Sequence, residues 1–232
     1  MTTFLLIRHA TNDWVRQGRL AGWTPGVHLN AEGQAQAQAL GERLAFVSLA
    51  AVYSSPLERA LETAQAVAGP HGLEVQIRMG IGEVQYGEWN GQTLKKLAKT
   101  PRWTALRRYP SGTRFPGGET IGEMQARVVA TLNEIGTRHP QDIIAVVAHA
   151  DVIKAAVAYY VGVPLDLFQR LVISPASLTV LTFGRFGPQL VRMNDTGTLD
   201  LTRERFSKSH RCKRQRKTQR LLGPLAVGQR MK

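Results

Sequence analysis

Short apolar segments without polar alternation most restrict how this 232-residue chain can fold. A strand that is apolar at successive positions must be covered on both of its faces, which is typical of parallel sheets. Helical patterns separate most of these segments, so the sequence predicts an α/β fold with a mostly parallel central sheet and helices on both sides. The predicted strands are 4–7, 51–53, 143–148, 177–183 and 189–193, with a further candidate at 75–78.

Three helices are predicted from apolar residues at helical spacing. The first of them has Ser55 as a candidate N-cap, followed by Pro56 and by Glu58 as the acid of a capping box. The span from Leu94 to Gly118 shows no pattern from which an element can be predicted. The predicted helices are 56–68, 119–137 and about 151–161.

The formal net charge of +13 is concentrated near the C-terminus. Residues 203–232 hold eleven Lys and Arg against the single acid Glu204, whereas residues 1–202 hold 19 basic and 16 acidic residues. We therefore divide the chain into a domain at 1–202 and a basic tail at 203–232, whose low apolar content predicts disorder. The charge of the tail predicts non-specific, salt-dependent contact with polyanions such as nucleic acids.

Composition also argues against several classes of protein. The single cysteine, Cys212, permits neither a disulfide framework nor a cysteine metal cluster within one chain. No apolar run approaches the roughly 20 residues needed to cross a bilayer, and the N-terminus lacks the pattern of a secretory signal. We therefore expect a cytoplasmic protein that does not contact a membrane.

Cationic and polar side chains follow three of the predicted strands. Arg8 and His9 follow the first, Ser55 and Arg59 follow the second, and His149 closes the strand in the middle of the chain. In parallel α/β sheets, ligands bind beyond the carboxyl ends of the strands. Two arginines and two histidines that converge there, beside a helix N-terminus, would suit a phosphate group.

The residue types also predict roles in phosphoryl transfer. A neutral imidazole can attack phosphorus, which would make His9 the nucleophile, while arginine forks would stabilise charge on the phosphoryl oxygens. Glu83, in the glycine-rich stretch GIGEVQYGEWNGQT, is the best placed carboxyl to protonate the leaving oxygen. Each residue also has a structural interpretation, as a surface cation, a satisfied histidine or a loop carboxylate, but the combination favours catalysis.

The chain contains five motifs in the order LLIRHATNDW, YSSPLERALETA, GEVQYGEWNGQT, FPGGET and VVAHADVIKA. Together they resemble the phosphoglycerate-mutase-like branch of the histidine phosphatase superfamily, and in particular its actinobacterial members named phosphomutases. The resemblance covers roughly residues 3–195 and implies a three-layer α/β/α sandwich and a two-step reaction through a phosphohistidine. By motif position it implies His9 as nucleophile, Glu83 as proton donor, and Arg8, Arg59 and His149 as the phosphate pocket, with Asn12 and Gly22 as further substrate-binding candidates.

Three departures from the family pattern bear on the activity. Ala10 and Ala150 follow the two histidines where the family usually has glycine, so we expect some geometric adjustment of the backbone. Val15 stands where many members have asparagine, which leaves Asn12 as its candidate replacement. Ala21 stands where mutases tend to carry a hydroxyl residue, and this change, like that at Val15, weakens the case for a mutase.

The first hypothesis is therefore a phosphomonoesterase that needs neither metal ion nor cofactor and hydrolyses a small-molecule phosphomonoester through a phosphohistidine on His9. The alternative is a 2,3-bisphosphoglycerate-dependent phosphomutase of the phosphoglycerate type. A third hypothesis, from another class, is a polyanion-binding protein that acts through its basic tail.

Four arginines lie in the segment before FPGGET. They would either bind a second acidic group of the substrate from a lid or form a solvated face. They are Arg102, Arg107, Arg108 and Arg114.

Overall fold

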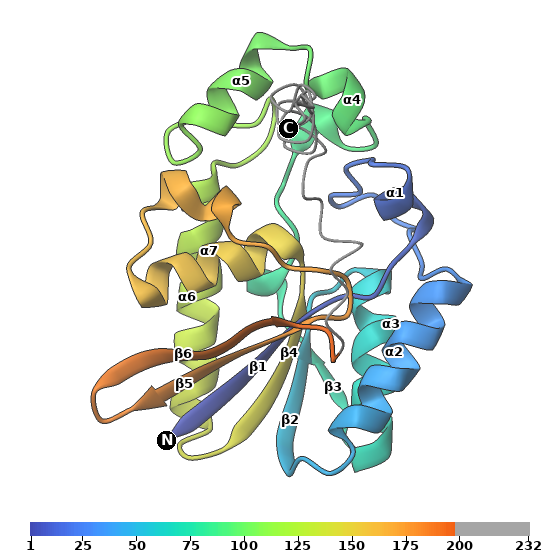
Figure 1. The fold of residues 1–232 in the computed structure, drawn as a ribbon, viewed down its shortest axis with the longest axis vertical. Coiled ribbons are helices and arrows are strands. Elements are labelled where there is room, and N and C mark those ends of the chain that lie inside the picture. Colours follow the sequence, from blue (N-terminus) through green and yellow to red (C-terminus); the bar gives the residue numbers. More distant parts are fainter. Residues whose placement is uncertain (198–232) are drawn as a thin grey trace, which may run out of the picture. The chain divides into compact units, whose positions relative to one another are not determined.

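The computed structural model describes residues 1–197, so the predicted tail at 203–232 lies outside the described residues. A six-stranded sheet with the order β3-β2-β4-β1-β5-β6 forms its centre (Figure 1). The first four of these strands are parallel to their neighbours, and β5 and β6 run antiparallel at one edge. The strands are β1 (Thr2–Arg8), β2 (Leu49–Ser54), β3 (Val75–Ile77), β4 (Ile143–Ala148), β5 (Leu178–Gly184) and β6 (Gly187–Asp195).

Helices cover both faces of this sheet (Figure 1). The helices α2 (Ala31–Leu44) and α3 (Glu58–Ala68) pack on one face and share a buried apolar cluster with it. The helices α6 (Ile121–Arg138) and α7 (Ala150–Val161) pack on the opposite face and belong to a second cluster. The prediction of a three-layer α/β/α sandwich with a mostly parallel sheet is therefore confirmed.

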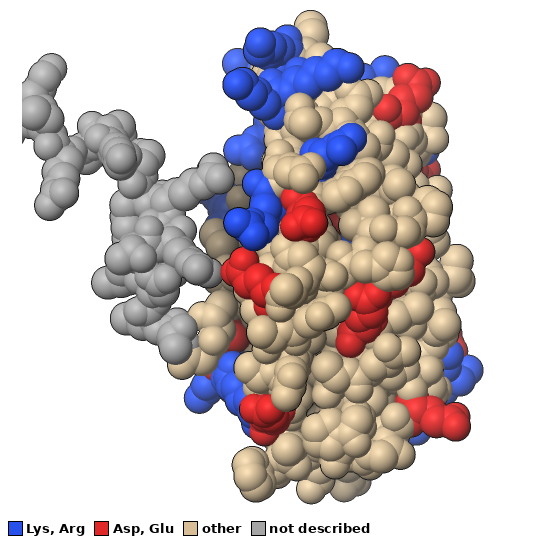
Figure 2. Space-filling model, turned by 90° about the vertical axis from the view of Figure 1, so that its right-hand side faces the viewer, with Lys and Arg blue, Asp and Glu red and all other residues tan. Residues whose placement is uncertain are grey.

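The segment between β3 and α6 crosses the end of the sheet where β1 and β4 finish (Figure 1). It contains the short helices α4 (Leu94–Leu97) and α5 (Pro101–Arg108), which the sequence patterns do not predict. Residues 89–118 hold seven Lys and Arg and no acidic residue, so basic charge is concentrated here as well as in the tail. Figure 2 shows basic side chains gathered at this end of the molecule.

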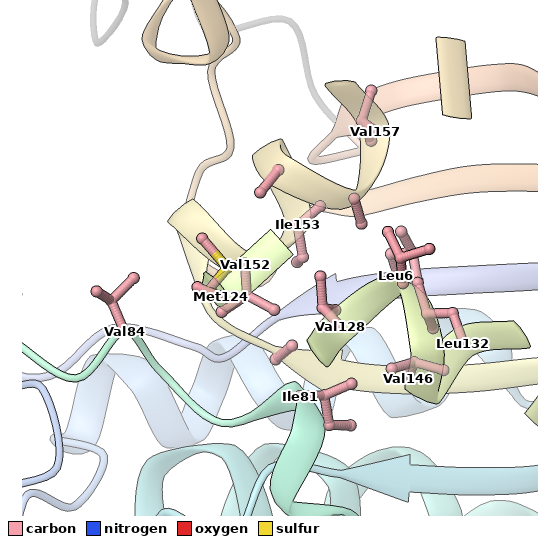
Figure 3. Packing of buried hydrophobic residues seen from close by; sticks show 14 of the residues in the cluster. Leu6, Ile81, Val84, Met124, Val128, Leu132, Val146, Val152, Ile153 and Val157 are labelled. Carbon is pink, nitrogen blue, oxygen red and sulfur yellow. The ribbon is translucent and has the colours of Figure 1, made fainter. Parts of the chain in front are cut away.

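Alternation along β1 explains the two apolar clusters. Phe4 and Leu6 belong to the cluster beneath α6 and α7, whereas Leu5 and Ile7 belong to the cluster beneath α2 and α3. Successive side chains of a strand point to opposite faces, so an uninterrupted apolar strand supplies both layers. Figure 3 shows Leu6 close to Leu132 of α6 within the first cluster.

The sequence patterns do not predict α2. Its buried stripe consists mainly of small residues, which give a weak apolar signal. At Gly41, a Cβ atom would lie 2.2 Å from the backbone oxygen of Ala66 in α3, so glycine allows the two helices to approach closely. The buried residues of α2 are Gly33, Ala37, Leu40, Gly41 and Leu44.

The predicted capping of α3 is wrong. The helix begins at Glu58 with Leu57 as its N-cap, and no side chain caps it. The Ser55 hydroxyl lies instead 2.7 Å from Nε2 of His149, a partner that the sequence around Ser55 cannot reveal. Among residues 1–197 no helix is long and apolar enough to cross a lipid bilayer.

Candidate active site

Three parallel strand ends place the predicted site residues side by side. The register pairs Arg8 at the end of β1 with Ala148 at the end of β4, so the next residues of both strands, His9 and His149, become neighbours. Their ring centroids are 5.1 Å apart. Arg59, in the first turn of α3 after β2, brings its Nη2 to 3.4 Å from Nδ1 of His149.

His9 is buried and is held in one tautomer. Its Nδ1 lies 2.7 Å from the carbonyl oxygen of Ala10. Because a carbonyl can only accept, Nδ1 carries the ring proton and Nε2 keeps its lone pair. Burial lowers the pKa of His9 well below its usual 6.5, and the charges of Arg59 and Arg8 lower it further. The ring is therefore neutral and able to act as a nucleophile.

Arg8 and Arg59, whose charges act on His9, and the nearby N-cap residue Asn12 carry buried hydrogen-bond donors without a partner. Among residues 1–197, seven buried side-chain polar atoms have no hydrogen-bond partner, and four of them are Nε of Arg8, Nε and Nη1 of Arg59, and Nδ2 of Asn12. The two arginines are held through other atoms, since Arg8 Nη1 donates to the Ile173 carbonyl at 2.6 Å and Arg59 Nη2 to that of Gly22 at 2.8 Å. Buried donors are rarely left without an acceptor, so this arrangement is suited to an anion.

Local contacts fix the two further candidates, Asn12 and Gly22. The Asn12 Oδ1 accepts from the backbone N–H of Val15 at 2.9 Å as the N-cap of α1 (Asp13–Arg16). This bond fixes which end of the amide is Nδ2. Gly22 has φ +49°, and a Cβ there would lie 1.9 Å from Oδ1 of Asn90, so only glycine brings this carbonyl to Arg59 without strain.

Both nitrogens of His149 face protein groups. Nε2 lies 2.7 Å from the Ser55 hydroxyl, and Nδ1 lies 3.7 Å from Oε2 of Glu83. Although His149 is the N-cap residue of α7, its side chain does not cap the helix, because the ring faces the site. Burial lowers the pKa of His149 well below its usual value, with Arg59 as the next cause, so this ring is also neutral.

Glu83 has the protonation behaviour of an acid–base catalyst. Burial raises its pKa from 4.5 to about 7; the nearby Asp151 carboxylate also raises it, while Arg59 and Arg8 oppose the rise. One oxygen accepts from the backbone N–H of Val84 at 2.9 Å. Near neutral pH the group is therefore about half protonated and can both donate and accept a proton.

Arg127 fixes the loop that carries Glu83, a role that the sequence analysis missed. From α6 its guanidinium donates to the carbonyl of Glu83 at 2.8 Å and forms two hydrogen bonds, of 2.7 and 3.1 Å, with the carboxylate of Glu119. Trp23 Nε1 donates to the same carbonyl at 2.6 Å. The only sign of this role in the sequence is that Arg127 lies beside the buried apolar stripe of a predicted helix.

Asp151 and Tyr86 are further site residues that the sequence analysis did not assign. Tyr86 donates to the Asp151 carboxylate at 3.4 Å, and the charge of Asp151 acts on both Arg8 and Glu83. Burial raises the pKa of Tyr86 well above 10, so the hydroxyl remains a neutral donor. The sequence gives one sign of a role for Asp151, which is its position two residues after the strand-end His149 in the motif VVAHADVIKA.

The alanines that follow the two histidines, Ala10 and Ala150, have no left-handed backbone angle. Among residues 1–197, the non-glycine residues with positive φ are Gln141, Ala176 and Asn194. Both alanines thus have angles that any residue adopts, and the two histidines need no following glycine here. No group of three or more His, Cys, Asp and Glu side chains suited to a metal ion occurs in the described part of the chain.

A family model for the histidine phosphatase superfamily (branch 1) matches residues 4–196. The chain belongs to this superfamily. It is 30% identical over 201 residues to phosphoserine phosphatase 1 of Hydrogenobacter thermophilus, a match that covers 84% of this chain and 93% of that protein. The predicted family is therefore confirmed.

Solved structures agree with this membership. A phosphoserine phosphatase mutant of Entamoeba histolytica in complex with phosphoserine matches with a TM-score of 0.79 and 26% identity, covering 86% of this chain and all of that one. A mycobacterial glucosyl-3-phosphoglycerate phosphatase matches with a TM-score of 0.75 and 27% identity over 83% of this chain and 98% of that one. This histidine phosphatase is accordingly a phosphomonoesterase that acts on a small phosphorylated substrate through a histidine intermediate.

Proposed function

We propose that His9 is the nucleophile of this histidine phosphatase, and that Arg8, Arg59 and Asn12 bind the phosphoryl oxygens. The observation that carries this proposal is the group of buried, unpartnered donors of these three residues beside a neutral imidazole. These donors supply the positive field that a metal ion supplies in other phosphatases, so we propose that neither metal nor cofactor takes part.

In the first step, Nε2 of His9 attacks phosphorus and forms a phosphorus–nitrogen bond, while the bond from phosphorus to the ester oxygen breaks. Glu83 in its protonated form gives its proton to the departing oxygen, which leaves as the alcohol. The bound phosphoryl dianion raises the pKa of nearby groups, which keeps Glu83 protonated and favours His149 as a hydrogen-bond donor. Arg59 and Arg8 stabilise the charge that spreads over the three phosphoryl oxygens.

In the second step, water attacks phosphorus and the bond to His9 breaks. The Glu83 carboxylate, left without its proton by the first step, accepts a proton from this water, and inorganic phosphate departs. A pKa of about 7 suits both roles, because a carboxyl near its usual pKa would rarely be protonated at neutral pH. Arg127 and Trp23 hold Glu83 in place for both steps through its backbone carbonyl.

The decisive experiment is phosphate release from a panel of phosphomonoesters in the presence of EDTA, including O-phosphoserine and glucosyl-3-phosphoglycerate. His9→Ala should abolish release, while the matched variant His28→Ala, an exposed histidine paired with Glu62 outside the site, should keep it. Absence of release from every ester, with conversion of 3-phosphoglycerate in the presence of 2,3-bisphosphoglycerate, would favour the mutase alternative instead.

Glu83 can be tested by the dependence on the leaving group. Glu83→Gln should slow the hydrolysis of an alkyl ester far more than that of p-nitrophenyl phosphate, since nitrophenolate leaves without a proton. Equal losses on the two esters would remove Glu83 from the role of acid.

The basic tail and the cytoplasmic location stay predictions from the sequence. Truncation after residue 202 tests the polyanion-binding hypothesis. RNA or DNA binding that remains equally strong and equally salt-sensitive in the truncated protein would show that the tail is not responsible.

A further inference from the structure

A cavity of about 240 Å³ adjoins the catalytic residues. Tyr86 and Asp151 line it, and the charge of Asp151 acts on Arg8 and on Glu83. The alcohol part of a bound ester would enter this cavity if it extended from Glu83, the proposed proton donor, past Asp151. The cavity is thus placed to select among esters.

The wall of this cavity is mainly apolar. Three of its residues, Trp103, Leu106 and Arg107, come from α5, which the sequence predicted only as part of a candidate lid. Nine of the thirteen lining residues are apolar or aromatic. The main apolar side chains are Leu20, Trp103, Leu106, Phe115, Ile121 and Phe168.

Four polar side chains of the cavity lining form one hydrogen-bonded group around Asp151. Asp151 accepts from Lys154 at 3.2 Å and from Gln169 at 3.3 Å, in addition to Tyr86. Of the four arginines that precede FPGGET, Arg107 lines the cavity, whereas Arg114 donates to Glu123 outside it. Asp151, Lys154 and Gln169 thus pair with one another, and Arg107 is the remaining charged residue of the lining. The nine apolar or aromatic side chains offer no matched partner to an amino group or a carboxylate such as those of serine, which would lose their water against them.

We infer that the cavity binds an apolar, ring-sized alcohol part, so that the preferred substrates are phosphomonoesters of aromatic or similarly apolar primary alcohols. An apolar cavity of roughly 150 Å³ accepts benzene, so one of this volume accommodates a ring with a short chain. This inference rests on the proposed function, because it requires the phosphate to bind beside His9.

The test compares kcat/KM for 2-phenylethyl phosphate, ethyl phosphate and O-phospho-L-serine. All three are primary alkyl esters, so differences report chiefly on the alcohol part. We expect kcat/KM for the phenylethyl ester to exceed that for each of the other two by at least about tenfold. Leu106→Trp fills the cavity and should reduce this ratio toward one, whereas Thr104→Trp, at an exposed position of the same helix outside the cavity lining, should leave it unchanged.

The outcomes separate the two proposals. Phosphate release from all three esters with similar kcat/KM, or with phosphoserine preferred, would overturn the inference and leave the proposed function intact. Release from none of them would overturn both. If Leu106→Trp does not fold, the ratio of kcat/KM for the phenylethyl ester to that for the other two esters, measured with the wild-type protein, still tests the inference. If Leu106→Trp folds and this ratio is unchanged, the cavity does not bind the alcohol part.

Discussion

The titration of Glu83 should be visible in the stability of the protein. Its pKa is about 7 in the folded state and 4.5 without the protein environment. Between these values the folded protein holds a proton that the unfolded chain releases, so the free energy of unfolding falls as pH rises through this window. With these two pKa values, the Glu83 contribution falls by about 2.5 kcal/mol between pH 5 and pH 8. Glu83→Gln removes this contribution.

Urea denaturation of the wild type and of Glu83→Gln at pH 5 and pH 8 measures the effect. The quantity to compare is the change in unfolding free energy between the two pH values, because the effects of other titrating groups are largely common to both proteins. Glu88→Gln, at an exposed carboxyl of the same loop, is the matched control and should behave as the wild type. If the wild type and Glu83→Gln lost the same stability, the raised pKa, and with it the argument for Glu83 as proton donor, would be refuted.

Three further substitutions test other parts of the structure. Arg59→Met removes two unpartnered donors and should lower kcat/KM about 100- to 1000-fold. The assay is phosphate release by protein that circular dichroism shows to be folded. A loss below tenfold would contradict phosphate binding by this residue. Asn12→Asp keeps the acceptor for Val15 N–H but removes Nδ2, so kcat/KM should fall more than tenfold with an unchanged melting temperature. Asn12→Ala removes the acceptor as well, so it should also lower the free energy of unfolding by about 1 kcal/mol. Gly41→Ala places a methyl group against the Ala66 carbonyl and should lower the unfolding free energy by about 1–3 kcal/mol. The folded fraction should keep its kcat/KM. Unchanged stability would refute the close packing of α2 on α3.

Local patterns located most of the elements. The predicted strands and helices begin and end within two residues of the observed ones, because an uninterrupted apolar run or a helical stripe is a property of neighbouring residues. The patterns failed for α2, whose buried face is built mainly from glycine and alanine, and for the start of α3, where Ser55 bonds a histidine 94 positions away. The short helices α4 and α5 carry too little apolar periodicity to be predicted.

The sequence by itself determined the fold class and the superfamily, because ordered motifs and strand patterns can be read along the chain. It also predicts seven site residues from strand-end positions and motifs, and their roles stay proposals. Only the tertiary structure decided what those residues can do. The raised pKa of Glu83 depends on burial and on Asp151, the tautomer of His9 on one backbone contact, and the closeness of His9 to His149 on the register of β1 and β4. The cavity likewise joins side chains from Leu20 to Gln169. Such properties follow from distances between distant segments and from exclusion of water, and neither is encoded in any single stretch of the chain.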